Sequence, residues 1–432
     1  MDAKPASSLK TIRLLVILCV LVAASCLTWQ AWDMFGSKHR PMLQGWDDSF
    51  YYYWLPSVVI DHDVDFANQL AHSDTLESTA KDLFAAERTA TGLLPNKYPP
   101  GWAIGSLPFF LFAHLFAPAG TTGFEPIYLM SVWLGQMLYA AIGLWLAVKI
   151  AARFFPLAIA SVAVLSGWLA SPLIYYQTAR ISMSHSQVFV LAVAVFWLAL
   201  RIADGDQRKR NWILLGFCAA LLIVTRNLAG LYLIGPGWII LRKLRSAQSA
   251  LWLVLGAVVP CAAQLLAWKI IYGSWLCYSY QGERFNFAQN HLFEILFSPQ
   301  HGWFYWHPLM CVGVVGFLAW AWRLSPGRAW IASLGICIAL NAAWECWWLG
   351  SSFGNRGFEA STFFAMLGLA VALQAAEARP ALRRALAIII GAAIAWNLIL
   401  LALYLTQRIS HEDAVTYRDA AQALFKGCTA QP

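Results

Sequence analysis

The segment from Ile12 to Trp32, IRLLVILCVLVAASCLTWQAW, decides the fold class of this chain. A helix of about 20 apolar residues is long enough to cross the hydrocarbon core of a bilayer. Further apolar runs follow, and with the first they predict an all-α polytopic membrane protein of about 11 transmembrane helices. The later runs are 126–148, 156–177, 183–200, 211–224, 228–241, 250–271, 306–322, 329–345, 358–376 and 385–405.

The composition of the chain indicates the same class. Of its 432 residues, 60% are hydrophobic and only 12% are charged, and the mean hydropathy is +0.58. A soluble domain is nearer half apolar and a quarter charged. These values exclude a water-soluble enzyme, a disordered chain and a small secreted domain held by disulfides.

The distribution of charge predicts the topology, because basic residues favour the cytoplasmic side of a membrane. If the apolar element 99–118 does not span, the cytoplasmic segments hold 17 of the 30 basic and 4 of the 22 acidic residues. The inner face is then +13 and the outer face −5, so the overall +8 needs no nucleic-acid partner. If 99–118 crossed the membrane, every later basic cluster would lie outside. We therefore expect this element to be juxtamembrane or re-entrant.

This topology divides the chain into a cytoplasmic N-terminus, a transmembrane domain and a periplasmic C-terminal tail. Their bounds are 1–11, 12–405 and 406–432. Within the transmembrane domain, a long first periplasmic loop (33–98) is expected to carry juxtamembrane helices, and a second large loop occupies 272–305. Nearly all the unusual polar residues lie on the outer face, so we expect any site to open there.

The first candidate site is the segment 45–54, GWDDSFYYYW, in which two carboxylates lie among aromatic residues. On a helix, Asp47 would share a face with Tyr51, and Asp48 with Tyr52. A carboxylate beside aromatic walls at a membrane surface is partly desolvated, which makes it a better general base. The alternative is structural, with Asp48 as the N-cap of a helix.

A second acidic cluster consists of Asp61, Asp63 and Asp65, whose oxygens could bind a divalent cation. A 12-residue calcium loop is not completed, because position 12 counted from Asp61 is His72. A solvated acidic turn is the simpler interpretation. We expect no obligatory cofactor, and a divalent cation at this weak cluster is the one metal that the sequence leaves open.

Three basic residues on the outer face are candidates for binding phosphate. Lys97 precedes the stiff turn 99–101, Pro-Pro-Gly. Arg226 lies at the tip of a short apolar hairpin, and Arg356 lies between two glycines. A charge within the bilayer is unfavourable and indicates function by default, and a guanidinium fork suits phosphate. The alternatives are a lysine that reaches the membrane interface, and arginines that contact lipid headgroups or nearby glutamates.

Other polar residues could bind a substrate. The loop 272–306 interleaves aromatic residues with Gln, His, Asn and Glu, which suits sugars because a sugar ring needs flat apolar faces and hydroxyl partners. The possible substrate-binding residues are Tyr51, Tyr52, His185, Glu283, Arg284 and His301.

Four short motifs follow one another along the outer face. They are Asp47-Asp48-Ser49-Phe50-Tyr51, Lys97-Tyr98-Pro99-Pro100-Gly101, Thr225-Arg226 and Phe353-Gly354-Asn355-Arg356. Their order and the topology resemble the GT-C superfamily of integral-membrane glycosyltransferases, in particular the protein mannosyltransferase and aminoarabinose transferase group (glycosyltransferase family 39-like). Many relatives have Asp-Glu where this chain has Asp-Asp, and only about 25 residues follow the last predicted span.

The resemblance implies a GT-C-like bundle in the inner membrane of a bacterium. It implies an enzyme that moves a sugar from a polyprenyl-phosphate donor to a lipid, glycan or protein acceptor on the periplasmic face. An Asp would take the proton of the acceptor hydroxyl as it attacks C1 with inversion. Asp47 would be this base, with Asp48 in support. Lys97, Arg226 and Arg356 would stabilise the departing phosphate.

Two other functional classes are open at this point. A lipid-linked glycan polymerase or ligase would use Arg and His chemistry in the outer loops without the acidic pair. A lipid or sugar transporter or flippase would show an inverted repeat and charges deep in several spans, and the sequence shows neither.

Overall fold

The computed structural model describes residues 5–35, 43, 45–72, 87–244, 246–280 and 283–425. Across these residues the regular structure is helical, with one isolated bridge between Phe285 and Trp344 and no β-strand. The predicted all-α class is therefore confirmed.

Every predicted apolar run coincides with helical structure. The covering helices are α1 (Pro5–Phe35), α6 (Pro126–Ala151), α7 (Leu157–Leu169), α8 (His185–Ala203), α9 (Lys209–Thr225), η3 (Asn227–Leu233) with α10 (Ile234–Leu241), α11 (Ala247–Tyr272), α14 (Pro308–Ala321), α15 (Gly327–Ala343), α16 (Ser361–Ala376) and α17 (Pro380–Leu405). In the described ranges, five helices are long and apolar enough to cross a membrane, namely α1, α6, α8, α11 and α17. The count of about 11 spans stays a prediction, because the other helices are shorter.

Shorter elements lie in the predicted outer segments. The first loop contains α2 (Trp46–Pro56), the π-helical turn η1 (Ser57–Asp61) and α3 (Ala67–Ala71). The loop therefore carries helices as expected, and their juxtamembrane position stays a prediction. The remaining elements are α5 (Gly101–His114), η2 (Tyr175–Ala179), α12 (Leu292–Phe297), α13 (Trp303–Trp306), η4 (Arg356–Phe358) and α18 (Tyr417–Phe425).

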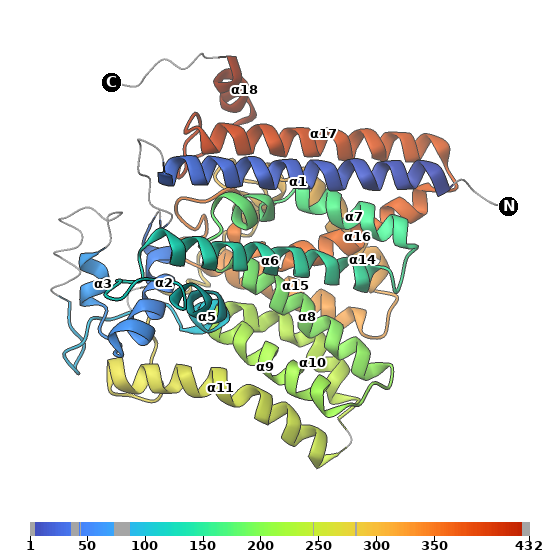
Figure 1. Cartoon of the computed structure of the whole chain (residues 1–432). Helices are drawn as coiled ribbons and strands as arrows, with labels where there is room; N and C mark the ends of the chain where they lie inside the picture. The colour runs from blue at the N-terminus through green and yellow to red at the C-terminus, as the bar shows by residue number, and fades with distance from the viewer. Residues whose placement is uncertain are drawn as a thin grey trace. The chain divides into compact units, whose positions relative to one another are not determined.

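The chain folds as two compact units, each made of segments that are distant in sequence. Unit 1 consists of 1–22, 147–175 and 284–432, and unit 2 consists of 23–146 and 176–283. Figure 1 shows the helices of both units, coloured from blue at the N-terminus to red at the C-terminus.

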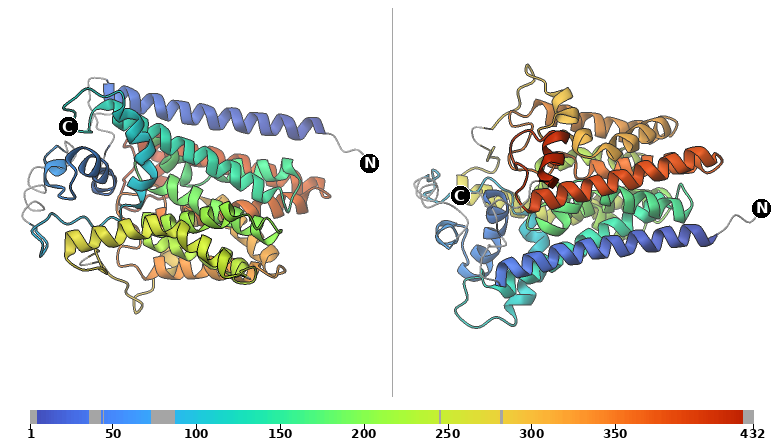
Figure 2. Two further views of the ribbon diagram at one scale, coloured as in Figure 1. Left: turned by 60° about the horizontal axis from the view of Figure 1, so that its bottom comes forward. Right: turned by 90° about the horizontal axis from the view of Figure 1, so that it is seen from above.

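Small residues bring the backbones of α9 and α11 together in unit 2. A Cβ on Gly216 of α9 would lie 1.9 Å from the carbonyl oxygen of Leu253, and one on Gly256 of α11 would lie 2.0 Å from that of Ile213. Only glycine fits at such contacts, which are typical of helix packing in membranes. The two helices consequently run side by side (Figures 1 and 2).

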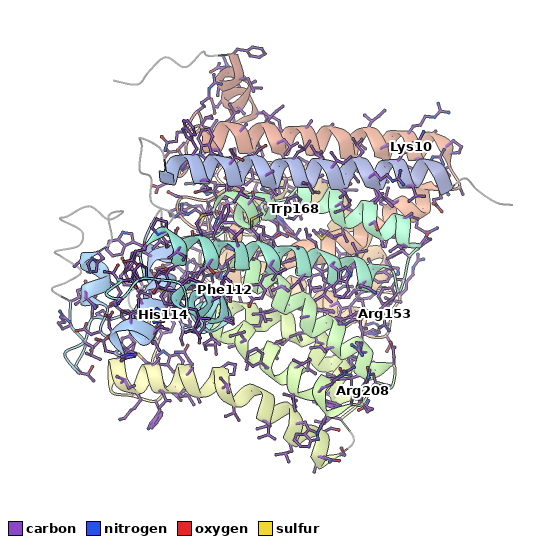
Figure 3. All side chains as sticks on the ribbon, in the orientation of Figure 1. Lys10, Phe112, His114, Arg153, Trp168 and Arg208 are labelled. Atoms are coloured by element: carbon purple, nitrogen blue, oxygen red, sulfur yellow. The ribbon has the colours of Figure 1, made fainter. Side chains whose placement is uncertain are left out.

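The helix α5 differs in direction from the long helices of unit 2. It lies across α6 and α11 (Figures 1 and 2). Its 14 residues extend about 21 Å, which is short of the roughly 30 Å of a hydrocarbon core. Phe112, near its C-terminal end, is 60% exposed (Figure 3). These features agree with the prediction of a juxtamembrane or re-entrant element, which stays a prediction.

In unit 1, α7 is shorter than the apolar run that predicted it. The run extends to residue 177, but α7 ends at Leu169. The side-chain amide of Asn397 on α17 donates to the carbonyl oxygens of Leu169 (2.8 Å) and Ser171 (3.1 Å). These bonds satisfy carbonyl groups at the end of the helix, which otherwise have no intrahelical partner. A side chain from a distant part of the chain, Asn397, thus stabilises the end of α7 at Leu169.

Candidate functional site

The helix α2 places both carboxylates of the acidic pair in its first turn. Gly45 is the N-cap, and no side chain caps this end. The interpretation of Asp48 as an N-cap is therefore wrong. Acidic residues are still favourable here, because they complement the positive end of the helix dipole. Adjacent residues point in different directions on a helix, so Asp47 and Asp48 enter different surroundings.

Asp48 is fully buried and is held by two partners that precede α8. Its Oδ2 accepts from the Ser182 hydroxyl at 2.9 Å and from Arg180 Nε at 3.3 Å, and its Oδ1 is 3.5 Å from Arg180 Nη2. A Cβ on Gly45 would lie 2.8 Å from Arg180 Nη2, so the absence of a side chain there lets the guanidinium approach. This arrangement fixes α2 against the segment before α8.

Asp47 is half-buried, and the hydroxyl of Tyr98 donates a hydrogen bond to its Oδ1. Burial, followed by the charge of Asp47, raises the pKa of Tyr98 well above its ordinary value. Tyr98 therefore stays protonated at neutral pH and serves as a fixed donor. It orients Asp47 and leaves this carboxylate, rather than Asp48, the more accessible of the two.

The two adjacent tyrosines of α2 have different roles. The ring of Tyr51 lies 4.8 Å from that of Tyr98, and its hydroxyl accepts from Ser184 at 3.4 Å. Tyr52 is also buried, but its hydroxyl donates to the carbonyl oxygen of Gly123 at 2.5 Å. Tyr51 thus belongs to the surroundings of Asp47, whereas Tyr52 anchors the loop before α6.

A cavity of about 300 Å³ adjoins these residues. Asp47 is not among the lining residues, but it accepts a hydrogen bond from one of them, Tyr98. The lining residues are Trp46, Phe50, Glu87, Pro95, Lys97, Tyr98, Tyr272, Ser279 and Glu283. Aromatic walls with a few charged groups are typical of a binding pocket for a small polar molecule.

Lys97 lies in the wall of this cavity, in an ion pair with Glu283. Their Nζ and Oε1 atoms are 2.5 Å apart, and both side chains are less than half exposed. The same Nζ lies 5.3 Å from the ring centroid of Tyr98 and 5.6 Å from that of Tyr280, within the range of cation–π attraction. The structure therefore brings two predicted residues together around one cavity.

Arg226 follows the last residue of α9, where the backbone turns to an extended conformation (φ −155°, ψ 114°). Its charge acts on Tyr280. Burial raises the pKa of Tyr280 well above its ordinary value, and Arg226 opposes this shift while Tyr51, Asp47 and Glu283 add to it. Tyr280 therefore lies in the field of four predicted site residues.

Arg356 belongs to unit 1 and is set on a rigid turn. The side chain of Asn355 accepts from the Gly357 N–H at 3.0 Å and donates to the Trp347 carbonyl oxygen at 3.1 Å. Gly354 has a positive φ of 63°, and a Cβ there would lie 2.2 Å from His307 Nε2. Position 354 thus requires glycine for two reasons, its positive φ and the close imidazole ring of His307.

The remaining substrate-binding candidates occupy varied settings. His301, in unit 1, is buried, and burial lowers its pKa to about 4, so it is neutral at neutral pH. Its Nδ1 lies 2.9 Å from the Trp348 carbonyl oxygen. Arg284 forms an exposed ion pair with Glu345 at 2.8 Å. In unit 2, His185 is buried at the start of α8.

The acidic cluster is divided among separate partners. Asp61 accepts from Gln69, Asp63 accepts from the Ser57 hydroxyl at 2.9 Å, and Asp65 pairs with Arg88 at 3.2 Å. Within the described residues, no group of three or more His, Cys, Asp or Glu side chains is arranged to hold a metal ion.

Sequence reasoning missed part of the site. The sequence does not identify Arg180 and Ser182 as partners of Asp48, because neither lies near Asp48 along the chain. Tyr98 lies in the quoted motif beside Lys97, and Tyr280 lies in the aromatic loop 272–306, but nothing in either segment singles out these two tyrosines. The only local signal was the aromatic character of both segments.

No protein-family model and no curated protein matches the chain. Solved structures share its fold, among them two of ArnT from Cupriavidus metallidurans. The structure in the apo state has a TM-score of 0.55 and 14% identity, over 97% of this chain and 69% of that one. The structure bound to undecaprenyl phosphate has a TM-score of 0.52 and 16% identity, over 96% and 68%. The chain is thus similar in fold to ArnT, as the sequence resemblance predicted, and this fold together with the long apolar helices confirms a multi-pass membrane protein.

Proposed function

We propose that this chain is a membrane glycosyltransferase that takes a sugar from a polyprenyl-phosphate-linked donor. The observation that carries the proposal is an aromatic cavity lined by a cationic residue, Lys97, and by Tyr98, whose hydroxyl donates to the half-buried carboxylate of Asp47. The fold supports it, because one of the ArnT structures of this fold contains undecaprenyl phosphate. The acceptor is a lipid, a glycan or a protein that presents a hydroxyl.

In the proposed reaction, the acceptor oxygen attacks C1 of the sugar from the face opposite the phosphate. The C1–O bond to phosphate breaks, and its electron pair leaves with the polyprenyl phosphate. Asp47 takes the proton of the attacking hydroxyl, which increases the negative charge on the oxygen as the new bond forms. The configuration at C1 is inverted.

The basic residues have the complementary task. Lys97 and Arg226, which both belong to unit 2, stabilise the negative charge that develops on the leaving phosphate. An arginine presents a planar fork of donors to phosphate oxygens, while a lysine acts as a point charge. Asp48 stays outside the chemistry and holds α2 in place through Arg180 and Ser182.

The site is proposed to face the periplasm, with the N-terminus in the cytoplasm and the C-terminal tail outside. The charge balance of +13 inside and −5 outside supports this orientation. A tag placed after Pro432 should react with a membrane-impermeant reagent in cells whose outer membrane is permeabilised. A tag that reacts only after the inner membrane is lysed would contradict this topology.

The direct test uses purified protein in detergent, where no transmembrane gradient exists. A bacterial envelope extract supplies both undecaprenyl-phosphate-linked sugars and hydroxyl-bearing lipid, glycan and protein acceptors. The sugars should be transferred to an acceptor, with release of undecaprenyl phosphate that mass spectrometry detects. Asp47→Asn protein, purified in the same way, is the matched control and should release almost none. Consumption that requires a sealed membrane and a gradient would support a transporter instead.

A further inference from the structure

The ammonium group of Lys97, which the proposed function assigns to the donor phosphate, is already paired with the carboxylate of Glu283. Lys97 Nζ is 2.5 Å from Glu283 Oε1, and the two side chains are 39% and 38% exposed. Both line the same cavity. An ammonium that already faces a carboxylate at this distance offers less attraction to a second anion, and the carboxylate itself repels that anion.

We propose that Glu283 is a competitor of the lipid phosphate: it holds Lys97 while the cavity is empty and releases it when the polyprenyl phosphate binds. This inference rests on the proposed function of Lys97. It assigns Glu283 a role opposite to that of a substrate-binding residue, because its carboxylate weakens the binding of the donor.

The contacts around the pair allow this exchange without movement of the backbone. The hydroxyl of Ser279 donates to the Lys97 carbonyl oxygen at 2.8 Å, and that of Tyr278 donates to the Glu283 carbonyl oxygen at 2.7 Å. These bonds fix the main chain on both sides of the pair. The carboxylate of Glu283 is partly exposed, so it can turn toward solvent by rotation of its own side chain.

The ammonium group of Lys97, in contrast, is also held by two aromatic rings. It lies 5.3 Å and 5.6 Å from the ring centroids of Tyr98 and Tyr280. Attraction to these rings persists after the carboxylate leaves. Lys97 is consequently kept at the cavity for the phosphate, next to the tyrosine that orients Asp47.

The test measures the affinity of the purified full-length protein for undecaprenyl phosphate, with neither sugar nor acceptor present. Glu283→Gln keeps the size of the side chain and removes its charge. It should tighten binding by about threefold to tenfold, the range expected when a partly exposed ion pair stops competing. In a Lys97→Met background the same change should leave only a small residual gain, because there is no ammonium left to release.

Asp206→Asn is the matched control. Asp206 pairs with Arg201 and, at 2.5 Å, with Arg208 in the turn before α9. Arg226 follows the opposite end of that helix, roughly 25 Å away. This variant also loses ion pairing and should bind undecaprenyl phosphate as the unmodified protein does. Thermal denaturation of all variants checks that they are folded.

The outcomes separate the inference from the function on which it rests. Weaker or unchanged binding by folded Glu283→Gln protein would overturn the proposed competition. If Lys97→Met protein nevertheless bound undecaprenyl phosphate more weakly than the unmodified protein, the proposed function of Lys97 would stand. An equal gain in the Lys97→Met background would also overturn it, since Glu283 would then act independently of Lys97. Failure of the unmodified protein to bind undecaprenyl phosphate would overturn both the proposed competition and the proposed function.

Discussion

Asp47→Asn should lower turnover by about 10²- to 10⁴-fold, the usual effect of removing a general base. Binding of undecaprenyl phosphate should change little, because Asp47 acts on the acceptor hydroxyl and not on the phosphate. Asparagine can still accept the hydrogen bond of Tyr98, so the local structure should persist. The loss should therefore appear in the chemical step alone.

The measurement is donor affinity and single-turnover rate, determined separately on the same preparation. Arg226→Ala should give the contrasting pattern, because loss of a residue that holds the phosphate before and during the reaction should lower both affinity and rate. Near-native turnover by Asp47→Asn would exclude Asp47 as the base. If folded Asp48→Asn protein were inactive at the same time, Asp48 would be the general base instead.

Asp48→Asn should destabilise the protein by about 3 kcal/mol or more, because it removes one partner of a buried ion pair. The carboxylate has no exposed surface, and Arg180 is only 19% exposed, so its charge would remain poorly solvated. Ser182 can still donate to the new amide oxygen, which is why the loss should fall short of complete unfolding. Thermal denaturation in detergent should show a clearly lower midpoint.

A second substitution tests the origin of that loss. Arg180→Met in the Asp48→Asn background removes the stranded charge and should recover part of the stability. Asp47→Asn is the matched control, since it is the same chemical change at the neighbouring position, and it should denature close to the unmodified protein. Equal loss of stability in the two single variants would contradict the division of roles between the two carboxylates.

The positions of the helices were predictable from the sequence where they depend on residues that are close together along the chain. The length and hydropathy of runs such as 250–271 predicted α11 to within a few residues, because a helix that satisfies its own backbone groups is required in an apolar environment. The break around Thr225 and Arg226 was also visible, since polar residues interrupt an apolar run. The end of α7 was not, because Asn397 stabilises it from 228 residues away.

The sequence by itself determined that Asp47, Asp48 and Lys97 are unusual, because adjacent charges among aromatic residues stand out in an apolar chain. It left open which carboxylate is accessible. That was decided by Arg180 and Ser182, which reach Asp48 across 132 and 134 residues, and by Tyr98, which reaches Asp47 across 51. Glu283, the partner of Lys97, is 186 residues away. Hydropathy and spacing describe neighbours along the chain, whereas desolvation and charge pairing depend on neighbours in space, so only the tertiary structure could assign these roles.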